Sequence, residues 1–363
     1  MTKQLEYLDK LKQLRKDAPK PFGLYSATCI GLDGGLGYYL QNFQDSNFID
    51  FSSGLKAYRN TDYVPQRTPC KLVKQKGRVK LFEYSEQGDP ILLVPSMVNK
   101  NYIFDLYEDN SFIKHLISEG YRPYIIDWDE PYEDSEKINL QSLVEDYILY
   151  FSEFLNNELN EKIHLLGYCM GGVFTLISAL KQQNLYKSLT LVATPFDFNE
   201  MPFTGMMKFY KSFNLEYLKT SNVSAEVIQS LFFMLDCKGV LSRIKKFAKI
   251  KNEEQMKRMV ALEDWLSDCI DFENTMAVDI LNLWYGENRI YHEELDYSKF
   301  KLKTYLVTAS NDGIVPRKSS LPLLDKITNV EHMPVRSGHV GIMAGRRSID
   351  DFYKKISKKL KNI

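Results

Sequence analysis

Cysteine is scarce in this sequence, and neither sign of charge is in excess. The chain of 363 residues has five cysteines, and Lys plus Arg balance Asp plus Glu at 47 each. An odd number of widely spaced cysteines, with no Cys-x-x-Cys pair and no Cys/His cluster, argues against a disulfide framework and against a metal site. This cysteine usage is typical of a reducing compartment, so we expect a cytoplasmic protein without a metal.

The zero net charge argues against a nucleic-acid partner, because binding to a phosphate backbone needs a surplus of Lys and Arg on one face. Little net charge also means little repulsion between molecules, which favours association of the chain either with itself, as a homo-oligomer, or with a partner. Long hydrophobic runs are missing too. No stretch of about 18 apolar residues predicts a transmembrane segment, and Met1–Phe22 is too charged for a signal peptide.

Three regions with different patterns follow one another along the chain. Residues 1–69 begin with leucines at helical spacing, which predict an amphipathic helix, and continue as an irregular extension rich in glycine and aromatic residues. These leucines are Leu5, Leu8, Leu11 and Leu14. The helix would pack either on the core of its own chain or on another surface.

From residue 70, short apolar runs alternate with longer helical patterns, which is typical of β-α-β units around a buried parallel sheet. The runs expected to form strands start at Val79, Ile91, Tyr124, Ile163, Leu189, Tyr305 and Val330. The rhythm breaks over 196–294, which we interpret as a mainly helical cap inserted into a core of 70–195 and 295–363. Its Met and aromatic residues either line an apolar substrate path or bury a small core of the cap itself. They are Met201, Phe203, Met206, Met207, Phe209 and Tyr210.

The most informative motif is Gly-Tyr-Cys-Met-Gly, which connects an apolar run to a helical pattern. A nucleophile on a sharp strand-to-helix turn needs small neighbours two residues away, and Gly167 and Gly171 meet that need around Cys169. A helix that begins after Cys169 points its unpaired N–H groups at the sulfur and favours a thiolate. The motif therefore predicts a nucleophile elbow with cysteine as the nucleophile, in an α/β-hydrolase fold with a mostly parallel, doubly wound sheet.

An acid and a base follow this motif in the chain order that the fold requires. Asp312 ends an apolar run, where a carboxylate faces the crevice at the carboxyl ends of the strands. His339 lies between two glycines, and its usual pKa of about 6.5 suits proton transfer at neutral pH. The alternative acids Asp197, Asp236 and Asp268 fall inside the cap, and the other histidines have no motif around them. We therefore expect a catalytic triad of Cys169, His339 and Asp312.

A tetrahedral intermediate at Cys169 would need two N–H donors for its oxyanion. The first is expected to be the main-chain N–H of Met170, directly after the nucleophile. The second should come from the loop after the early apolar run Ile91–Val94. We expect Val98 in that role, with Met97 as the alternative.

With these residues in place, the sequence resembles the polyhydroxyalkanoate synthases, above all the short catalytic subunits of the two-component types. The resemblance is collinear from about residue 65 to 350 and includes more than the elbow. Its segments are Pro95–Leu106, Tyr124–Pro131, Leu262–Asp268 with Asn288, Asp312 with Ile314–Pro316, and Gly338–Gly341.

The resemblance implies a substrate of the (R)-3-hydroxyacyl-coenzyme A class, a growing polyester chain, and coenzyme A as the released product rather than a resident cofactor. It also implies a second synthase subunit as a partner and the surface of a polyester granule as a site of action, to which the N-terminal helix could also bind. Two other functions fit the same residues. A Cys-dependent hydrolase (thioesterase, dienelactone hydrolase or polyester depolymerase) would use the same triad with water, and a granule-associated protein would have the fold without activity.

Overall fold

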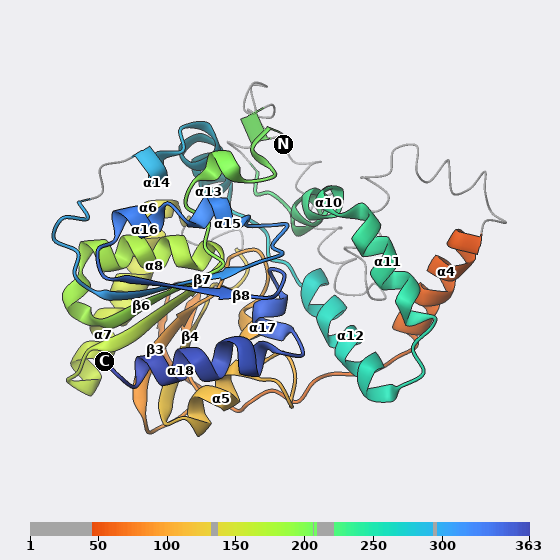
Figure 1. The fold of residues 1–363 in the computed structure, drawn as a ribbon, viewed down its shortest axis with the longest axis horizontal. Helices are drawn as coiled ribbons and strands as arrows, with labels where there is room; N and C mark the ends of the chain where they lie inside the picture. Colours follow the sequence, from red (N-terminus) through yellow and green to blue (C-terminus); the bar gives the residue numbers. More distant parts are fainter. Residues whose placement is uncertain (1–45, 132–136, 206, 209–220, 293–295) are drawn as a thin grey trace. The chain divides into compact units, whose positions relative to one another are not determined.

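The computed structural model describes residues 46–131, 137–205, 207–208, 221–292 and 296–363 (Figure 1). The chain divides into two compact units: Met1–Gln66 with Val223–Asp271, and Arg67–Asn222 with Phe272–Ile363. We call the first the helical unit and the second the sheet unit. The expected leucine helix, and Met206, Phe209 and Tyr210 of the expected cap, lie outside the described residues.

An eight-stranded sheet with strand order β1-β2-β4-β3-β5-β6-β7-β8 is the core of the sheet unit. β2 runs antiparallel to both of its neighbours, and all other adjacent strands are parallel. This confirms the predicted fold class. The strands are β1 Lys71–Lys76, β2 Val79–Glu83, β3 Asp89–Val94, β4 Tyr121–Asp127, β5 Ile163–Tyr168, β6 Tyr186–Val192, β7 Lys303–Ala309 and β8 Val330–Val335.

The central strands are buried on both faces, which explains their nearly continuous apolar sequences. All six residues of β5 are buried, and so are the last five of β3. Helices cover both faces of the sheet, with α8 on one face and α5 and α18 on the other (Figure 1). The edge strand β1 was not predicted, because it alternates lysine with other residues and is largely exposed.

The described helical elements of the sheet unit are short, apart from α7 and α8. In chain order they are η1 Asn101–Asp105, α5 Phe112–Ser118, α6 Leu140–Ser142, η2 Leu143–Leu149, α7 Tyr150–Leu159, α8 Met170–Lys181, η3 Gln183–Leu185, η4 Phe198–Glu200, α13 Asn274–Asp279, η6 Ile280–Gly286, α14 Arg289–His292, α15 Arg317–Ser320, α16 Leu323–Lys326, α17 Gly341–Ala344, η7 Ile349–Tyr353 and α18 Lys354–Leu360.

The described part of the helical unit contains α4 Ser46–Arg59, α10 Ala225–Leu235, α11 Cys237–Phe247 and α12 Glu253–Ser267. Its core is formed by Tyr58, Ile244, Phe247 and Val260. Gly54 of α4 lies directly against the main chain of α11, where a side chain would have no room. The expected cap at 196–294 is therefore shared: Val223–Asp271 packs with α4, and the flanking parts belong to the sheet unit.

The register of the parallel strands brings several loops to one edge of the sheet. Val94 at the end of β3 pairs with Gly167 in β5. The end of β5 pairs with the end of β6 at Val192, and Ala309 at the end of β7 pairs with Val335 at the end of β8. The loops after β3, β5, β7 and β8 thus start side by side. These loops carry the residues that the sequence predicts to be functional.

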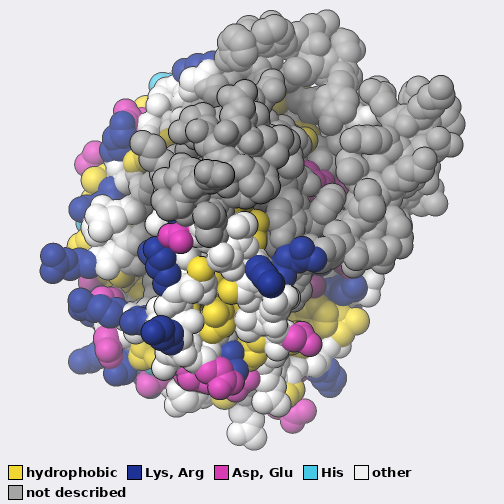
Figure 2. Space-filling model, turned by 90° about the vertical axis from the view of Figure 1, so that its right-hand side faces the viewer, with side chains coloured by type: hydrophobic (Ala, Val, Ile, Leu, Met, Phe, Trp, Pro, Cys, Tyr) yellow, Lys and Arg dark blue, Asp and Glu magenta, His cyan; other side chains and the backbone are white. Residues whose placement is uncertain are grey.

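Charges of both signs are spread over the described surface. Figure 2 shows Lys and Arg side chains alternating with Asp and Glu side chains on the coloured part of one face. Within the described ranges, no helix has the length and apolar character that crossing a bilayer requires.

Candidate active site

Cys169 occupies the sharp turn between β5 and α8. Its backbone has φ 55° and ψ −122°, a conformation that costs a non-glycine residue on the order of 1–3 kcal/mol. Its N–H donates to the carbonyl of Val192 in β6 at 2.8 Å, which ties the strained residue to the neighbouring strand. Only 9% of Cys169 is exposed. The turn thus places the thiol at the edge of the sheet rather than inside it.

Glycines allow this turn to pack closely. A Cβ at Gly171 would collide with the main-chain carbonyls of Val94 and Pro95, and a Cβ at Gly172 would collide with the side chain of Thr194. Gly167 likewise lies against the backbone of Gly171. Gly171 therefore lets the nucleophile turn lie against the loop that follows β3, while Gly167 and Gly172 let the turn pack against α8 and Thr194.

Asp312 lies in the loop after β7, and its side chain is completely buried. One carboxylate oxygen, Oδ1, accepts hydrogen bonds from the main-chain N–H groups of Ile314 and Val315 at 2.9 and 2.8 Å. The other, Oδ2, lies 2.8 Å from Nδ1 of His339. The two amide donors fix the orientation of the carboxylate, so that one oxygen is aimed at the imidazole.

His339 follows β8 and contacts both other residues of the predicted triad. With Nδ1 directed at Asp312, Nε2 is the nitrogen left for the hydrogen bond between the imidazole and the side chain of Cys169. Burial disfavours the imidazolium, but the negative charges and hydrogen bonds of Cys169 and Asp312 outweigh it and raise the pKa of His339 to about 10. The structure therefore brings Cys169, His339 and Asp312 together, with the imidazole between the carboxylate and the sulfur.

Two tyrosines border this cluster. The hydroxyl of Tyr168 donates to the main-chain carbonyl of His339 at 3.4 Å, and its ring lies 5.4 Å from the imidazole between centroids. The pKa of Tyr168 is raised by burial and by the charges of Cys169 and Asp312, and that of Tyr285 by burial and by Cys169. Both phenols therefore stay neutral. Tyr285 cannot be singled out from the sequence, because nothing in the cap sequence indicates which aromatic residue lies near the thiol.

The predicted oxyanion donors differ in whether a hydrogen-bond acceptor already lies next to their N–H groups. Met170 is the first residue of α8, where main-chain N–H groups have no acceptor within the helix. Val98 lies in the loop after β3, and its N–H donates to Oγ of Ser96 at 3.3 Å. Met97, the alternative, is also buried. The N–H of Val98 thus has an acceptor in this structure, which an oxyanion would have to replace.

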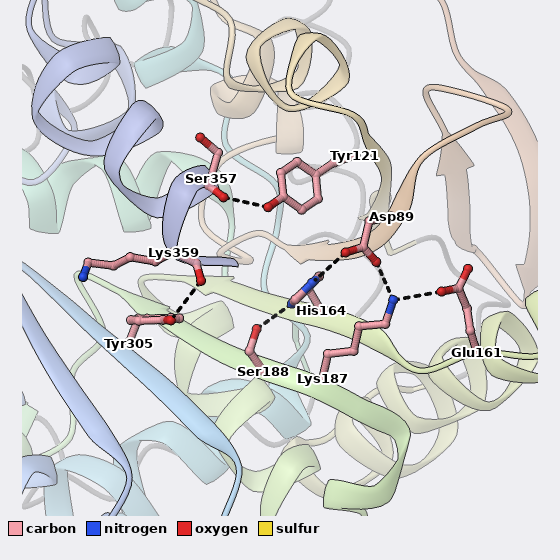
Figure 3. Close-up of polar contacts among 9 residues, drawn as sticks. All are labelled: Asp89, Tyr121, Glu161, His164, Lys187, Ser188, Tyr305, Ser357 and Lys359. Atoms are coloured by element: carbon pink, nitrogen blue, oxygen red, sulfur yellow. Dashed lines mark hydrogen bonds and ion pairs between the residues drawn. The ribbon is translucent and has the colours of Figure 1, made fainter. Parts of the chain in front are cut away.

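The remaining histidines are engaged elsewhere. His164 lies near the amino end of β5, where Ser188 and Asp89 contact its two ring nitrogens (Figure 3). Nε2 of His332 pairs with Thr308, and Nε2 of His115 with Ser357. His292 ends α14 and packs edge-on against Tyr291.

The alternative acids are likewise occupied. Asp197 accepts hydrogen bonds from the side chain of Asn288 and from the N–H of Asn199. Asp236 caps α11 through the N–H of Gly239, and Asp268 ends α12, both in the helical unit. Asp312 is thus the carboxylate among those weighed that contacts His339.

Aromatic side chains from separate segments surround the start of α8. Phe174 of α8 packs against Trp128 and Trp284, with centroids 6.5 and 5.7 Å apart, and Phe198 packs against Trp284 and Tyr285. These rings belong to the sheet unit and include the flanking parts of the expected cap. Met201 and Phe203 are buried as well. This arrangement provides an apolar surrounding near Cys169.

Within the described parts of the chain, no group of three or more His, Cys, Asp or Glu side chains is arranged to hold a metal ion. Cys70 and Cys169 are free cysteines. The chemistry that this site can carry out with its own residues is nucleophilic catalysis by a thiolate.

Comparisons with known proteins concern the fold and the family of the chain. The profile of the alpha/beta hydrolase fold family matches residues 89–345. The poly(3-hydroxyalkanoate) polymerase subunit PhaC of Haloferax mediterranei is 26% identical over 313 residues, which cover 80% of this chain and 63% of that protein. PhaC of Allochromatium vinosum is 22% identical over 312 residues, which cover 80% of this chain and 88% of the relative. The resemblance to these polymerase subunits is thereby confirmed. The chain spans less than two thirds of the Haloferax mediterranei subunit.

Among solved structures, a serine hydrolase of Cycloclasticus zankles superposes with a TM-score of 0.51 at 14% identity, covering 81% of this chain and 98% of the hydrolase. At that level of identity the likeness concerns the fold alone.

Proposed function

The chain belongs to the alpha/beta hydrolase fold family, and from this premise we propose that it is an acyltransferase that polymerises (R)-3-hydroxyacyl-coenzyme A into polyhydroxyalkanoate. Cys169 is the nucleophile, His339 the general base and Asp312 the residue that orients the base. Relatives named as poly(3-hydroxyalkanoate) polymerase subunits support the polymer-forming activity. The proposal uses no resident cofactor and no metal, because coenzyme A arrives as part of the substrate.

The single observation that carries the proposal is the contact of His339 with both Cys169 and Asp312. In the first half of the reaction, the imidazole of His339 holds the proton that came from the Cys169 thiol, and the sulfur attacks the thioester carbonyl. The N–H groups of Met170 and Val98 stabilise the oxyanion. When the tetrahedral intermediate collapses, the bond to the coenzyme A sulfur breaks, and His339 returns the proton to the departing thiolate. The product of this step is an acyl-enzyme thioester.

In the second half, the hydroxyl at the end of another acyl chain attacks the acyl-enzyme. His339 accepts the hydroxyl proton as the new ester bond forms, and passes it to the sulfur of Cys169 as the thioester breaks. A thiol suits this cycle because substrate and acyl-enzyme are both thioesters, so the first transfer is nearly balanced. Each cycle lengthens the polyester by one unit and releases one coenzyme A.

The choice between chain growth and hydrolysis depends on water. Water in the site would hydrolyse the acyl-enzyme, so a transferase needs surroundings that exclude it. The rings of Phe198, Trp284 and Tyr285 provide such surroundings on the nucleophile's side of the sheet unit. We further propose that the enzyme is cytoplasmic and acts at the surface of its polyester granule. It would act there as a homo-oligomer and together with a second synthase subunit.

The test is a product analysis with the pure protein and (R)-3-hydroxybutyryl-coenzyme A, with and without a candidate second subunit. The proposal expects free coenzyme A together with insoluble polyester, and a stronger reaction when the partner is present. Free 3-hydroxybutyrate in an amount equal to the released coenzyme A would instead identify a hydrolase. No release of coenzyme A under either condition would contradict both functions.

A further inference from the structure

The loop that carries the expected oxyanion donor Val98 is tied to a residue outside the triad. The indole Nε1 of Trp128 donates a hydrogen bond to the main-chain carbonyl of Pro95 at 3.2 Å. We propose that Trp128 is a positioning residue, which holds the first turn after β3 so that its N–H groups are aimed at the oxyanion on Cys169. This inference rests on the function proposed above and adds a residue that the chemistry itself does not name.

Trp128 is well placed for this role because it connects three parts of the site. It directly follows β4, the strand beside β3, and only 3% of it is exposed. Its ring meets Phe174 of α8 edge-on. A single rigid side chain therefore fixes the loop after β3 relative to the helix that begins at the nucleophile. Rigid support of this kind keeps catalytic groups within fractions of an ångström of their working positions.

A second contact joins the same two loops. Lys100, at the far end of the loop after β3, lies 3.7 Å from Glu130, two residues beyond Trp128. Gly171 also lies close to the carbonyls of Val94 and Pro95. The start of the loop thus contacts Trp128 and the nucleophile turn, and its end is held by an ion pair, while the residues between can supply N–H donors.

The N–H of Val98, in the middle of the loop after β3, can donate to an acceptor other than the one it has now. Its hydrogen bond to Ser96 Oγ is 3.3 Å long, beyond the usual range for N–H···O bonds. A charged oxyanion is a stronger acceptor than a hydroxyl, so it can replace Ser96 at little cost. The carbonyl held by Trp128 belongs to the residue directly before Ser96. If that carbonyl were free to rotate, both the hydroxyl and the N–H would move with it.

Trp128→Phe removes the indole donor and keeps an aromatic ring against Phe174. The matched control is Trp265→Phe, which removes a buried indole from the helical unit. Two reactions of Cys169 are followed in each protein. Acylation by p-nitrophenyl butyrate and by 3-hydroxybutyryl-coenzyme A requires oxyanion stabilisation, whereas alkylation by iodoacetamide requires only the thiolate.

We expect Trp128→Phe to slow acylation by both acyl donors about 10- to 100-fold, the range for a displaced oxyanion donor, with alkylation unchanged. Trp265→Phe should alter neither rate. If acylation by Trp128→Phe is as fast as in the wild type, or if acylation and alkylation fall together, Trp128 has no positioning role. If the wild type reacts with the ester but never with the thioester, the proposed function fails, while the ester data still decide on Trp128.

If Trp128→Phe does not fold, Lys100→Met tests the same proposal, because it removes the ion pair that also joins the two loops. It removes a partly exposed ion pair and leaves the aromatic contacts in place. A loss of acylation of roughly two- to tenfold at unchanged alkylation supports a loop that must be held. Equal acylation by Lys100→Met and the wild type contradicts it.

Discussion

Nδ1 of His339 lies 2.8 Å from Oδ2 of Asp312, although 27 residues separate them in the chain. The two residues follow β7 and β8, whose last residues Ala309 and Val335 are paired in the sheet. Since these parallel strands end at the same edge, loops of only a few residues suffice to bring carboxylate and imidazole together. The contact is therefore a direct result of the sheet register.

Asp312→Asn is expected to lower the pKa of His339 from its raised value of about 10. Burial alone favours the neutral imidazole, and the carboxylate is one of the two charges that outweigh it. In the wild type the imidazole should remain protonated above neutral pH and lose its proton near pH 10, whereas in the variant it should do so at lower pH. NMR titration of labelled histidine measures this. We also expect kcat to fall by about 10²–10⁴-fold, as when an orienting carboxylate is removed from a triad.

His332 serves as the internal control for that titration. It lies in β8, seven residues before His339, and burial together with the charge of Arg317 lowers its pKa below 6.5. Its titration should be the same in the wild type and in Asp312→Asn. A shift of His332 as large as that of His339 would mean that the substitution disturbs the whole edge of the sheet.

Cys169→Ala is expected to abolish acyl transfer while the protein still folds. Alanine keeps a Cβ in the strained turn, so the backbone energy changes little, whereas the sulfur that forms the thioester is lost. Mass spectrometry after mixing with 3-hydroxybutyryl-coenzyme A should show an added acyl group on the wild type and none on the variant. Cys70→Ala is the control, because that free cysteine is exposed and should not affect labelling. Labelling of Cys169→Ala at the wild-type rate would identify another nucleophile.

Most of the sheet could be predicted from the sequence, since buried parallel strands have nearly continuous apolar runs. Strands β3 to β7 show this pattern, including β5 before the elbow, whereas β2 and β8 are only partly buried and are less clearly marked in the sequence. β1 could not be predicted, because an exposed edge strand such as Lys71–Lys76 has no apolar pattern and is defined only by its pairing with β2.

The nucleophile, base and acid were also accessible to sequence analysis, because glycines and strand ends mark where Cys169, His339 and Asp312 must lie. The supporting residues were not. Trp128 and Tyr285 reach the site from separate segments, and the direction of an aromatic ring depends on packing that no local pattern encodes. The grouping of Val223–Asp271 with α4 could not be predicted for the same reason, since the contact of Gly54 with α11 joins distant parts of the chain.

Glu273→Gln is expected to destabilise the sheet unit by about 3–5 kcal/mol, because it removes the negative charge from a buried ion pair with Arg78. The Glu273 carboxylate pairs with Arg78 just before β2, and the side chains are only 4% and 3% exposed. Its other oxygen accepts the N–H of Ile138. Glutamine preserves the shape of the side chain and one hydrogen-bond acceptor, so the lost stability measures the contribution of the negative charge. Urea unfolding of wild type and variant gives the difference.

Asp350→Asn is the matched control for that measurement. Asp350 pairs with Lys354 one helical turn away, and both side chains are more than half exposed. Pairs of this kind contribute only about 0.3–0.5 kcal/mol. If Glu273→Gln lowers the free energy of unfolding by no more than Asp350→Asn does, the buried pair contributes no more to stability than an exposed pair.

His164→Leu is expected to reduce stability by about 1–3 kcal/mol and to leave kcat unchanged. His164 bridges Ser188 Oγ at 2.7 Å and Asp89 Oδ2 at 3.1 Å, while Lys187 connects Asp89 to Glu161 (Figure 3). His164 and Ser188 are buried, so the variant leaves a hydroxyl without its partner.

The bonds from His164 and Lys187 also matter for the acid stability of the protein. Burial raises the pKa of Asp89, but these two bonds outweigh it and lower the pKa overall below 3.8. The contribution of Asp89 to stability is thus present above pH 3.8 and lost as the pH falls through the lowered pKa. In His164→Leu the pKa of Asp89 should be lowered less, so that less stability is lost on acidification.

Because the cluster lies at the amino ends of the strands, away from Cys169, turnover per folded molecule should not change. The double variant His164→Leu/Ser188→Ala, which removes both partners, should recover part of the lost stability in urea unfolding. A double variant less stable than His164→Leu would show that packing around the imidazole, rather than the orphaned hydroxyl, causes the loss.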